Sequence, residues 1–291
     1  MLIVEVIFLA VFWSWVFSAL VFLRNTILPH LPLIAAPEQF GLSAETVTFR
    51  AVDGVKLAGW KIPARDPSRP WIIGCHGLGS NRSDLLHIAA GLHQVGFNVL
   101  LFDFRGHGES AGRTTSFGWR EQRDLEGALA FLGSRPEIPS RPYGLYGISM
   151  GGAVALMVAG RDERIGAVVV ESPYANLADS IERHLRLLYP WLPRVPFAWF
   201  VHATYRIRFG VWPQRVSPQA ALKGFGARPL LLIRGGGDER MPDTDMQQLM
   251  RTGHGPKEFW VIPGAGHLES YGVNPQAYLA RVIRFFSQSM G

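Results

Sequence analysis

The sequence predicts an α/β fold built on a mostly parallel sheet that helices cover on both faces. Short continuous apolar segments, such as WIIGC at 71–75 and IGAVVV at 165–170, are typical of strands buried on both faces. Segments with helical spacing alternate with them along the chain, and this alternation favours a parallel sheet. Because 48% of the 291 residues are hydrophobic, the chain can bury a sizeable core.

The elements are expected in a regular order. A hairpin comes first, because Asp53-Gly54 separates two strand-like segments, ETVTFRAV and VKLAGWKI. Continuous apolar segments predict further strands, and amphipathic or apolar segments predict helices. The strands are WIIGCHG, FNVLLFDFRG, YGLYGIS, IGAVVVESP, PLLLIRGGGD and EFWVIPGAGH, and the helices are LLHIAAGLHQVG, REQRDLEGALAFLGS, MGGAVALMVAG, TDMQQLMRTG and PQAYLARVIRFFSQ.

The N-terminus has a different character from the rest of the chain. Residues 1 to 23 are apolar apart from Glu5 and two serines, and about 20 such residues span a bilayer as a helix. A cleaved signal peptide is one alternative, but the segment has no basic start and no small-residue cleavage site. A buried core helix is the other alternative, but the segment has no polar face to turn to water. We therefore expect an uncleaved membrane anchor at 1–24. By the positive-inside rule, Arg24 favours a cytoplasmic main domain.

The anchor is expected to be separate from the main domain. Residues 25–45 contain Pro29, Pro32 and Pro37 and are interpreted as a linker. The remaining residues, 46–291, form the predicted main domain. The prolines should keep anchor and domain mechanically separate, so that a chain without residues 1–28 stays soluble and active on a short ester.

Composition argues against several other classes of protein. The net charge of +6 comes from scattered arginines without a basic block or nucleic-acid motif, so we do not expect nucleic acid as a partner. The single cysteine, Cys75, rules out an internal disulfide framework. The sequence contains no metal-ligand cluster and no dinucleotide fingerprint, so no metal and no cofactor is expected.

Three residues that are far apart in sequence are expected at one edge of the sheet. Ser149 ends strand YGLYGIS, Asp238 follows strand PLLLIRGGG, and His267 follows strand EFWVIPGAG. Ligands of open parallel sheets bind at the carboxyl ends of the strands. A strand, then G-I-S-M-G, then a helix is the nucleophile-elbow arrangement, and the chain order Ser, Asp, His is that of the α/β-hydrolase fold. We therefore interpret Ser149 as a nucleophile rather than as a serine of a glycine-rich loop.

The other histidines divide by their position on the elements. His76 also ends a strand, whereas His254 precedes its strand and should lie at the opposite edge. The remaining ones are His87 and His93, expected as surface or packing residues of a helix, and His184 and His202, which could only approach the site from above.

Residues from about 46 to 288 resemble an α/β-hydrolase of the serine-hydrolase superfamily. The resemblance rests on HGLGSNR at 76–82, FDFRGHGES at 102–110, GISMGG at 147–152, GGGDERMP at 235–242 and GAGH at 264–267. The chain also looks like hydrolases related to dienelactone hydrolases, prolyl peptidases and membrane-anchored acyl hydrolases. One departure is Arg234, where many relatives have a histidine; that position is outside the catalytic triad.

The chemistry of these residues predicts their roles. His267 would take the proton of the Ser149 hydroxyl, and Asp238 would orient the imidazole. Asp238 as a helix N-cap and Glu171 as a rival acid remain alternatives, whereas Glu239 should point elsewhere.

The loops around the expected site also receive roles. The resemblance implies that the backbone N–H groups of Leu78 and Met150 bind the oxyanion. His76 is expected to shape its loop. The FDFRGHG residues Asp103, Arg105 and His107 are expected to be structural.

An insertion at about 174–217 separates two of the predicted strands. Ile181, His184, Leu185 and Leu188 fall on one helical face, with arginines opposite, and the aromatic segment YPWLPRVPFAWF follows. A packed helical lid over an acyl pocket is the preferred interpretation. A surface that also contacts the bilayer is the alternative.

The expected function is a serine hydrolase that cleaves a carboxylic ester of a small or lipid-like acyl substrate through an acyl-enzyme. A peptidase or amidase and a thioesterase are the nearest alternatives, and a non-catalytic binding protein on the same fold is a further one. The sequence leaves the acyl group, the leaving group and the oligomeric state open.

Overall fold

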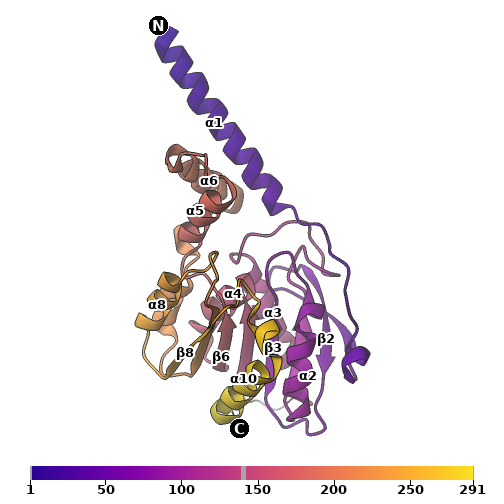
Figure 1. Ribbon diagram of the computed structural model, residues 1–291. Helices are drawn as coiled ribbons and strands as arrows, with labels where there is room; N and C mark the ends of the chain where they lie inside the picture. Colours follow the sequence, from indigo (N-terminus) through magenta and orange to yellow (C-terminus); the bar gives the residue numbers. More distant parts are fainter. Residues whose placement is uncertain (1, 139–141, 291) are drawn as a thin grey trace.

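An eight-stranded sheet forms the centre of the molecule in the computed structural model, which describes residues 2–138 and 142–290 (Figure 1). The strands lie in the order β1-β2-β4-β3-β5-β6-β7-β8. Strand β2 is antiparallel to both of its neighbours, and the strands from β4 to β8 are parallel to one another. The strands are β1 Glu45–Arg50, β2 Lys56–Ile62, β3 Trp71–Cys75, β4 Asn98–Phe102, β5 Tyr143–Ile148, β6 Ile165–Glu171, β7 Leu230–Gly235 and β8 Lys257–Ile262.

The register of the sheet brings the strand ends level. One row of paired residues crosses six strands: Phe102, Cys75, Gly147, Val170, Leu232 and Phe259. The loops that follow these parallel strands therefore meet along one edge, where sequence reasoning expected the functional residues. Every residue of β3, β4, β5 and β7 is buried, as expected for strands covered on both faces.

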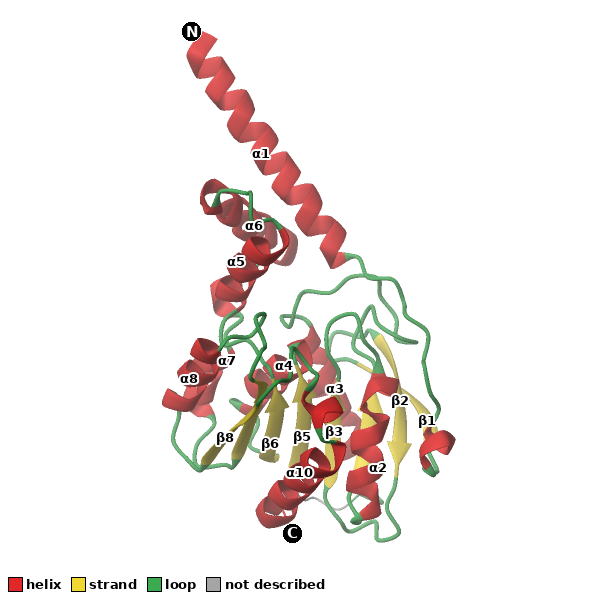
Figure 2. Cartoon of the chain, in the orientation of Figure 1, coloured by secondary structure: helices red, strands yellow, loops and turns green. Residues whose placement is uncertain are grey.

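Helices cover both faces of the sheet (Figure 2). Helices α3, α4 and α8 contribute to one hydrophobic cluster, and α2 and α10 contribute to the other. Each predicted strand and helix is present, with bounds that differ by a few residues. The helices are α1 Leu2–Thr26, α2 Leu86–Gln94, α3 Glu121–Gly133, α4 Met150–Ala159, α5 Leu177–Leu188, α6 Arg194–Phe209, α7 Pro218–Ala221, α8 Asp243–Arg251, α9 Ser270–Val273 and α10 Pro275–Met290, and the 3₁₀ turns are η1 Pro37–Phe40, η2 Arg82–Leu85, η3 Pro213–Arg215 and η4 Leu222–Gly224.

Helix α1 projects from the edge of the sheet where the parallel strands end (Figure 1). Its segment Val4–Thr26 is long and apolar enough to span a membrane, and most of it is exposed; a signal sequence would pass the same test. Met1, the first residue of the predicted anchor, lies outside the described residues, as does Gly291 at the end of the predicted main domain.

The expectation that prolines keep α1 mechanically separate is wrong. Phe22 is buried in the main hydrophobic cluster, and its ring lies 5.9 Å from the ring of Tyr205 on α6. The chain after α1 is also bound to the body, because Thr115 N–H donates to Thr26 O at 2.9 Å. Proline removes backbone donors, but it does not prevent the flanking residues from pairing with a neighbouring loop. The C-terminal end of α1 is therefore packed against the main domain.

The insertion forms two helices beside α1. Helices α5 and α6 stand above the ends of the strands, and α6 packs along the C-terminal half of α1 (Figures 1 and 2). Arg183 ties α5 to α8 through an ion pair with Asp245 at 2.8 Å.

Candidate active site

Ser149 occupies a strained turn between β5 and α4. Its backbone has φ 48° and ψ −119°, a conformation that a residue with a side chain rarely adopts. The two flanking glycines make the turn possible. A Cβ on Gly147 would lie 2.7 Å from Gly152 Cα, and a Cβ on Gly151 would collide with the carbonyl oxygens of Cys75 and His76. The turn points the Ser149 side chain away from the sheet at its carboxyl edge.

A chain of hydrogen bonds joins the three predicted residues. Ser149 Oγ lies 3.1 Å from His267 Nε2, and His267 Nδ1 lies 2.8 Å from Asp238 Oδ2. A carboxylate only accepts hydrogen bonds, so Nδ1 carries the ring proton. Nε2 is then the acceptor for the Ser149 hydroxyl, which is the arrangement that a general base requires.

The loop that carries Asp238 is fixed on several sides. Asp238 is buried, and its Oδ1 accepts the N–H groups of Arg240 at 3.0 Å and Met241 at 2.9 Å. Burial alone would raise the pKa of the Asp238 carboxyl. The hydrogen bond from His267 and its charge, together with the Met241 N–H, outweigh burial and lower that pKa. Asp238 therefore stays ionised beside His267 at neutral pH.

Arg234 supports the same loop from below. Its guanidinium donates to three backbone carbonyls, those of Met241 at 2.8 Å, Asp238 at 3.0 Å and Gly236 at 3.3 Å. From the sequence, Arg234 is a departure from the family pattern at a position outside the triad. The Arg234 side chain instead packs under the turn that carries Asp238. This contact joins β7 to the loop that follows it, and no local sequence pattern predicts it.

The two predicted oxyanion donors, Leu78 and Met150, line the same cavity as Ser149. Met150 begins α4, so its N–H lies at the positive end of the helix dipole. Leu78 belongs to the loop after β3, and in the described part of the chain neither N–H meets a protein acceptor. Both donors are thus free for a ligand.

Two buried histidines hold the Leu78 loop. His76 Nδ1 lies 2.8 Å from Gly77 O, while His76 Nε2 accepts the Phe104 N–H at 3.0 Å. His107 Nε2 accepts the Gly79 N–H at 3.2 Å. Since these contacts occupy the rings, His76 shapes its loop, as expected from the sequence. Burial lowers the pKa of both rings, which keeps them neutral.

The charged residues of the FDFRGHG segment also form structural contacts. Asp103 accepts the Arg82 N–H at 2.7 Å and pairs with the Arg82 guanidinium. Arg105 pairs with Asp124 at 2.6 Å and with Asp53 at 2.7 Å. The buried pairs Arg82–Asp103 and Arg105–Asp124 tie the loops after β3 and β4 to each other and to α3.

In the described part of the chain, Asp238 is the acid that is hydrogen-bonded to His267, and Glu171, Glu239 and His254 make other contacts or are exposed. Glu171 is buried with its Oε2 accepting the Tyr278 hydroxyl at 2.7 Å, and burial raises its pKa. Glu239 is exposed, and His254 is exposed before β8 at the opposite edge of the sheet. Of the two candidate acids, Asp238 contacts the imidazole and Glu171 does not.

An apolar cavity of about 210 Å³ adjoins Ser149. The predicted face of α5 lines it with Ile181, His184, Leu185 and Leu188. Sequence reasoning missed the residues of α1 that also line it, Val21, Phe22 and Asn25, because no local signal connects residue 22 with residue 149. Leu177, Val201, Met241 and three aromatic rings complete most of the wall, the rings being Phe117, Tyr174 and Tyr189.

Chemically, the site combines a hydroxyl, a base, an ionised acid, two free N–H donors and an apolar cavity. Such a set can attack a carbonyl carbon and stabilise the oxyanion that forms. No group of three or more His, Cys, Asp or Glu side chains suited to a metal ion occurs within residues 2–138 and 142–290.

The chain is similar to several known proteins. The family model described as serine aminopeptidase, S33, matches residues 66–221. The uncharacterized protein Rv2307c of Mycobacterium tuberculosis is 30% identical over 246 residues, which cover 84% of this chain and 79% of that protein. The uncharacterized protein YqkD of Bacillus subtilis is 30% identical over 236 residues, with coverages of 80% and 75%.

Among solved structures, the esterase Pf2001 of Pyrococcus furiosus matches with a TM-score of 0.75 and 26% identity, covering 91% of this chain and 98% of that one. An acylaminoacyl peptidase of Pyrococcus horikoshii shares the fold, with a TM-score of 0.64 at 18% identity over 86% of this chain and 42% of its own. These matches confirm the predicted α/β-hydrolase fold.

Proposed function

The chain belongs to the serine aminopeptidase S33 family of α/β-hydrolases, and we propose that it is a serine hydrolase that cleaves a carboxylic ester. The observation that carries the proposal is the hydrogen-bonded chain from Ser149 through His267 to Asp238 beside an apolar cavity.

The proposed reaction has two halves. Ser149 Oγ attacks the ester carbonyl carbon while His267 Nε2 takes the hydroxyl proton. The N–H groups of Leu78 and Met150 bind the oxyanion of the tetrahedral intermediate. The intermediate collapses, and the alcohol leaves with the proton from His267. Water, deprotonated by His267, then attacks the acyl-enzyme; the acid is released, and His267 returns the proton to Ser149 Oγ.

The lining of the cavity supports an ester rather than a peptide with a free N-terminus. A protonated amine that leaves water needs a carboxylate partner. No carboxylate of the described residues lines the cavity around Ser149. The structural similarity to an esterase favours the same choice. The family description keeps an amide substrate as the second candidate, and the same residues would also cleave a thioester.

We also propose that α1 anchors the enzyme in a membrane. Its length and apolar composition support this, and Arg24 in its last turn favours a cytoplasmic body.

A fluorophosphonate probe tests the proposed nucleophile. The full chain in detergent should be labelled on Ser149, as peptide mapping would show. Ser149→Ala should abolish labelling and lower ester hydrolysis by several orders of magnitude, because triad residues act as a unit. Ser134→Ala, on the surface after α3, is the matched control. A folded Ser149→Ala variant with full activity would contradict the proposal.

An ester, amide and thioester panel with matched acyl groups would separate the substrate classes. Esters should have the highest kcat/KM. A preference for aminoacyl amides would favour the second candidate.

A further inference from the structure

The cavity at Ser149 has a wall that comes from α1. Val21, Phe22 and Asn25 line it together with residues of α5, and Phe22 is 6% exposed. The helix that is apolar enough to span a membrane therefore also forms part of the acyl site. A helix whose only role is to anchor the chain would have no reason to enter the pocket.

Helix α6 packs beside α1 and contacts it as far toward the N-terminus of α1 as Trp15. Trp15 Nε1 donates to Thr204 Oγ1 at 3.3 Å, and the rings of Phe17 and Phe197 lie 6.4 Å apart, edge to face. Along an α-helix, Trp15 lies about 14 Å from Arg24. That distance is about half the thickness of the hydrocarbon core of a bilayer. If α1 spans a membrane, α6 must enter the same leaflet.

The segment that runs from the end of α5 into α6 is apolar enough to lie within the hydrocarbon core of a bilayer. We call residues 187–205, LLYPWLPRVPFAWFVHATY, the hairpin tip; Arg194 is its only formally charged residue, with histidine counted as neutral. Several large apolar side chains of the tip are exposed, with Trp191 70%, Val195 78% and Trp199 61% exposed. Such side chains in water would cost free energy, whereas a bilayer would cover them.

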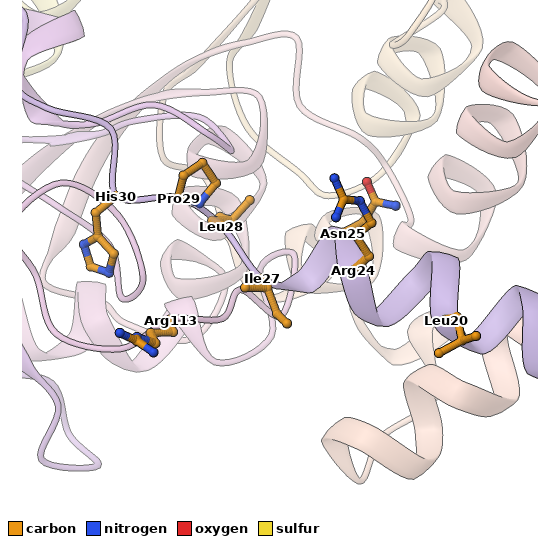
Figure 3. Close-up of a pocket in the computed structure, with 8 residues that line it drawn as sticks. All are labelled: Leu20, Arg24, Asn25, Ile27, Leu28, Pro29, His30 and Arg113. Carbon is orange, nitrogen blue, oxygen red and sulfur yellow. The ribbon is translucent and has the colours of Figure 1, made fainter.

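Basic side chains mark the level at which the hydrocarbon would end. Figure 3 shows the hollow beside the last turn of α1, where Arg24 and Arg113 lie with His30. No acidic side chain of the described residues lines this hollow, and Asn25 lines both it and the cavity at Ser149. Basic groups at this position suit the anionic surface of a membrane.

We propose that the hairpin tip inserts into the leaflet beside α1, so that the cavity receives the acyl chain of a membrane-resident carboxylic ester directly from the bilayer. The substrate class is then a long-chain acyl ester held in the membrane. The ester bond reaches Ser149 at the level of the headgroups, while its acyl chain stays in apolar surroundings throughout. This proposal rests on the serine-hydrolase function proposed above.

Insertion is tested on the full chain in phosphatidylcholine vesicles. In the variant Trp199→Cys, the new cysteine is labelled with an environment-sensitive fluorophore. Val95→Cys, labelled in the same way, is the matched control, because Val95 is exposed at the opposite edge of the sheet. The native Cys75 is buried, so it should not react with the label. A lipid with a nitroxide on its acyl chain should quench the label at 199 and leave the label at 95 unaffected. Equal quenching of the two labels would overturn the proposal. Quenching at 199 that appears only when the protein-to-lipid ratio is high would also overturn it, because the hairpin tip would then contact a second copy of the chain.

Delivery of the substrate is tested by a charged tip. The double variant Trp191→Glu and Trp199→Glu changes two exposed side chains that do not line the cavity, and circular dichroism checks its fold. Hydrolysis of 4-methylumbelliferyl palmitate in vesicles should fall at least tenfold. Hydrolysis of the soluble acetate ester should stay within twofold.

The outcomes separate the two proposals. If the variant hydrolyses the palmitate in vesicles like the wild type, delivery from the bilayer is wrong and the serine-hydrolase function stands. If the wild type hydrolyses neither ester and Ser149 resists the fluorophosphonate, the proposed function itself fails.

Discussion

Ser149, His267 and Asp238 depend on one another through the position of a single proton. The lowered pKa of Asp238 keeps that residue an acceptor, which places the ring proton on His267 Nδ1 and leaves Nε2 for Ser149. Loss of the carboxylate would allow the other tautomer, in which Nε2 carries the proton and cannot accept it from serine. The orientation of the imidazole is thus as important as its basicity.

This dependence predicts how the two candidate acids differ. Asp238→Asn should lower kcat about 10⁴-fold, by analogy with the aspartate of other triads. Glu171→Gln should lower kcat far less, because Glu171 contacts Tyr278 and not the imidazole. Steady-state kinetics on a short soluble ester would measure both. The opposite ranking would move the acid to the end of β6.

Residues around the site were predictable to different degrees. Ser149, Asp238 and His267 each follow a strand with a clear apolar pattern, so the topology of the sheet was enough to bring them to one edge. Arg234 was not predictable, because its contacts are with carbonyls of a loop whose path depends on the whole turn. A contact between residues that are far apart in sequence cannot be predicted from one sequence unless the spacing of residues within a helix or strand indicates it.

At the scale of elements, α1 has two halves with different surroundings. Phe8, in the first half, is 68% exposed, whereas Phe22 is 6% exposed among Tyr205, Phe209 and Phe117. The apolar composition of α1 was sufficient to predict a helix that is long and apolar enough to span a membrane. It could not predict the docking of its second half, because a bilayer and a protein core select the same side chains.

The two halves should respond differently to the same substitution. Phe22→Ala should destabilise the protein by about 3 to 5 kcal/mol, the range for a buried phenylalanine, and should also impair hydrolysis of a short ester. Phe8→Ala is the matched control on the same helix and should change neither. Thermal unfolding in detergent, together with the ester assay, measures both effects. If Phe22→Ala behaved like Phe8→Ala, α1 would be an anchor without a role in the site.

At the scale of the whole molecule, several histidines are buried in positions where a charge is disfavoured. Burial lowers the pKa of His76, His87, His107 and His184, and that of His87 falls from 6.5 to about 4. These residues come from loops and helices on different sides of the sheet. Protonation therefore acts against the fold at more than one place: at His87 on α2, at His184 on α5, and where the rings of His76 and His107 lie 5.0 Å apart.

The direction of the resulting pH dependence follows from linkage. Between pH 4 and 6.5 the unfolded chain binds a proton at His87 that the folded chain does not, so stability rises with pH across this window. The stabilisation is complete above pH 6.5 and is lost as the pH falls toward 4, and His87 alone accounts for up to about 3 kcal/mol. We expect the free energy of unfolding, from denaturant titrations at pH 7.5 and 5, to be clearly lower at pH 5.

Replacement of His87 should flatten this dependence. The His87 ring lies 4.0 Å from that of Tyr271, so His87→Phe keeps an aromatic contact and removes the titrating group. Tyr271→Phe is the matched control, because it alters the same contact and leaves the histidine in place. The difference in unfolding free energy between pH 7.5 and 5 should shrink by about 1 to 2 kcal/mol in His87→Phe and stay at the wild-type value in Tyr271→Phe. An unchanged difference in His87→Phe would show that His87 is protonated as readily in the folded chain as in the unfolded one, and that the acid sensitivity of the fold arises elsewhere.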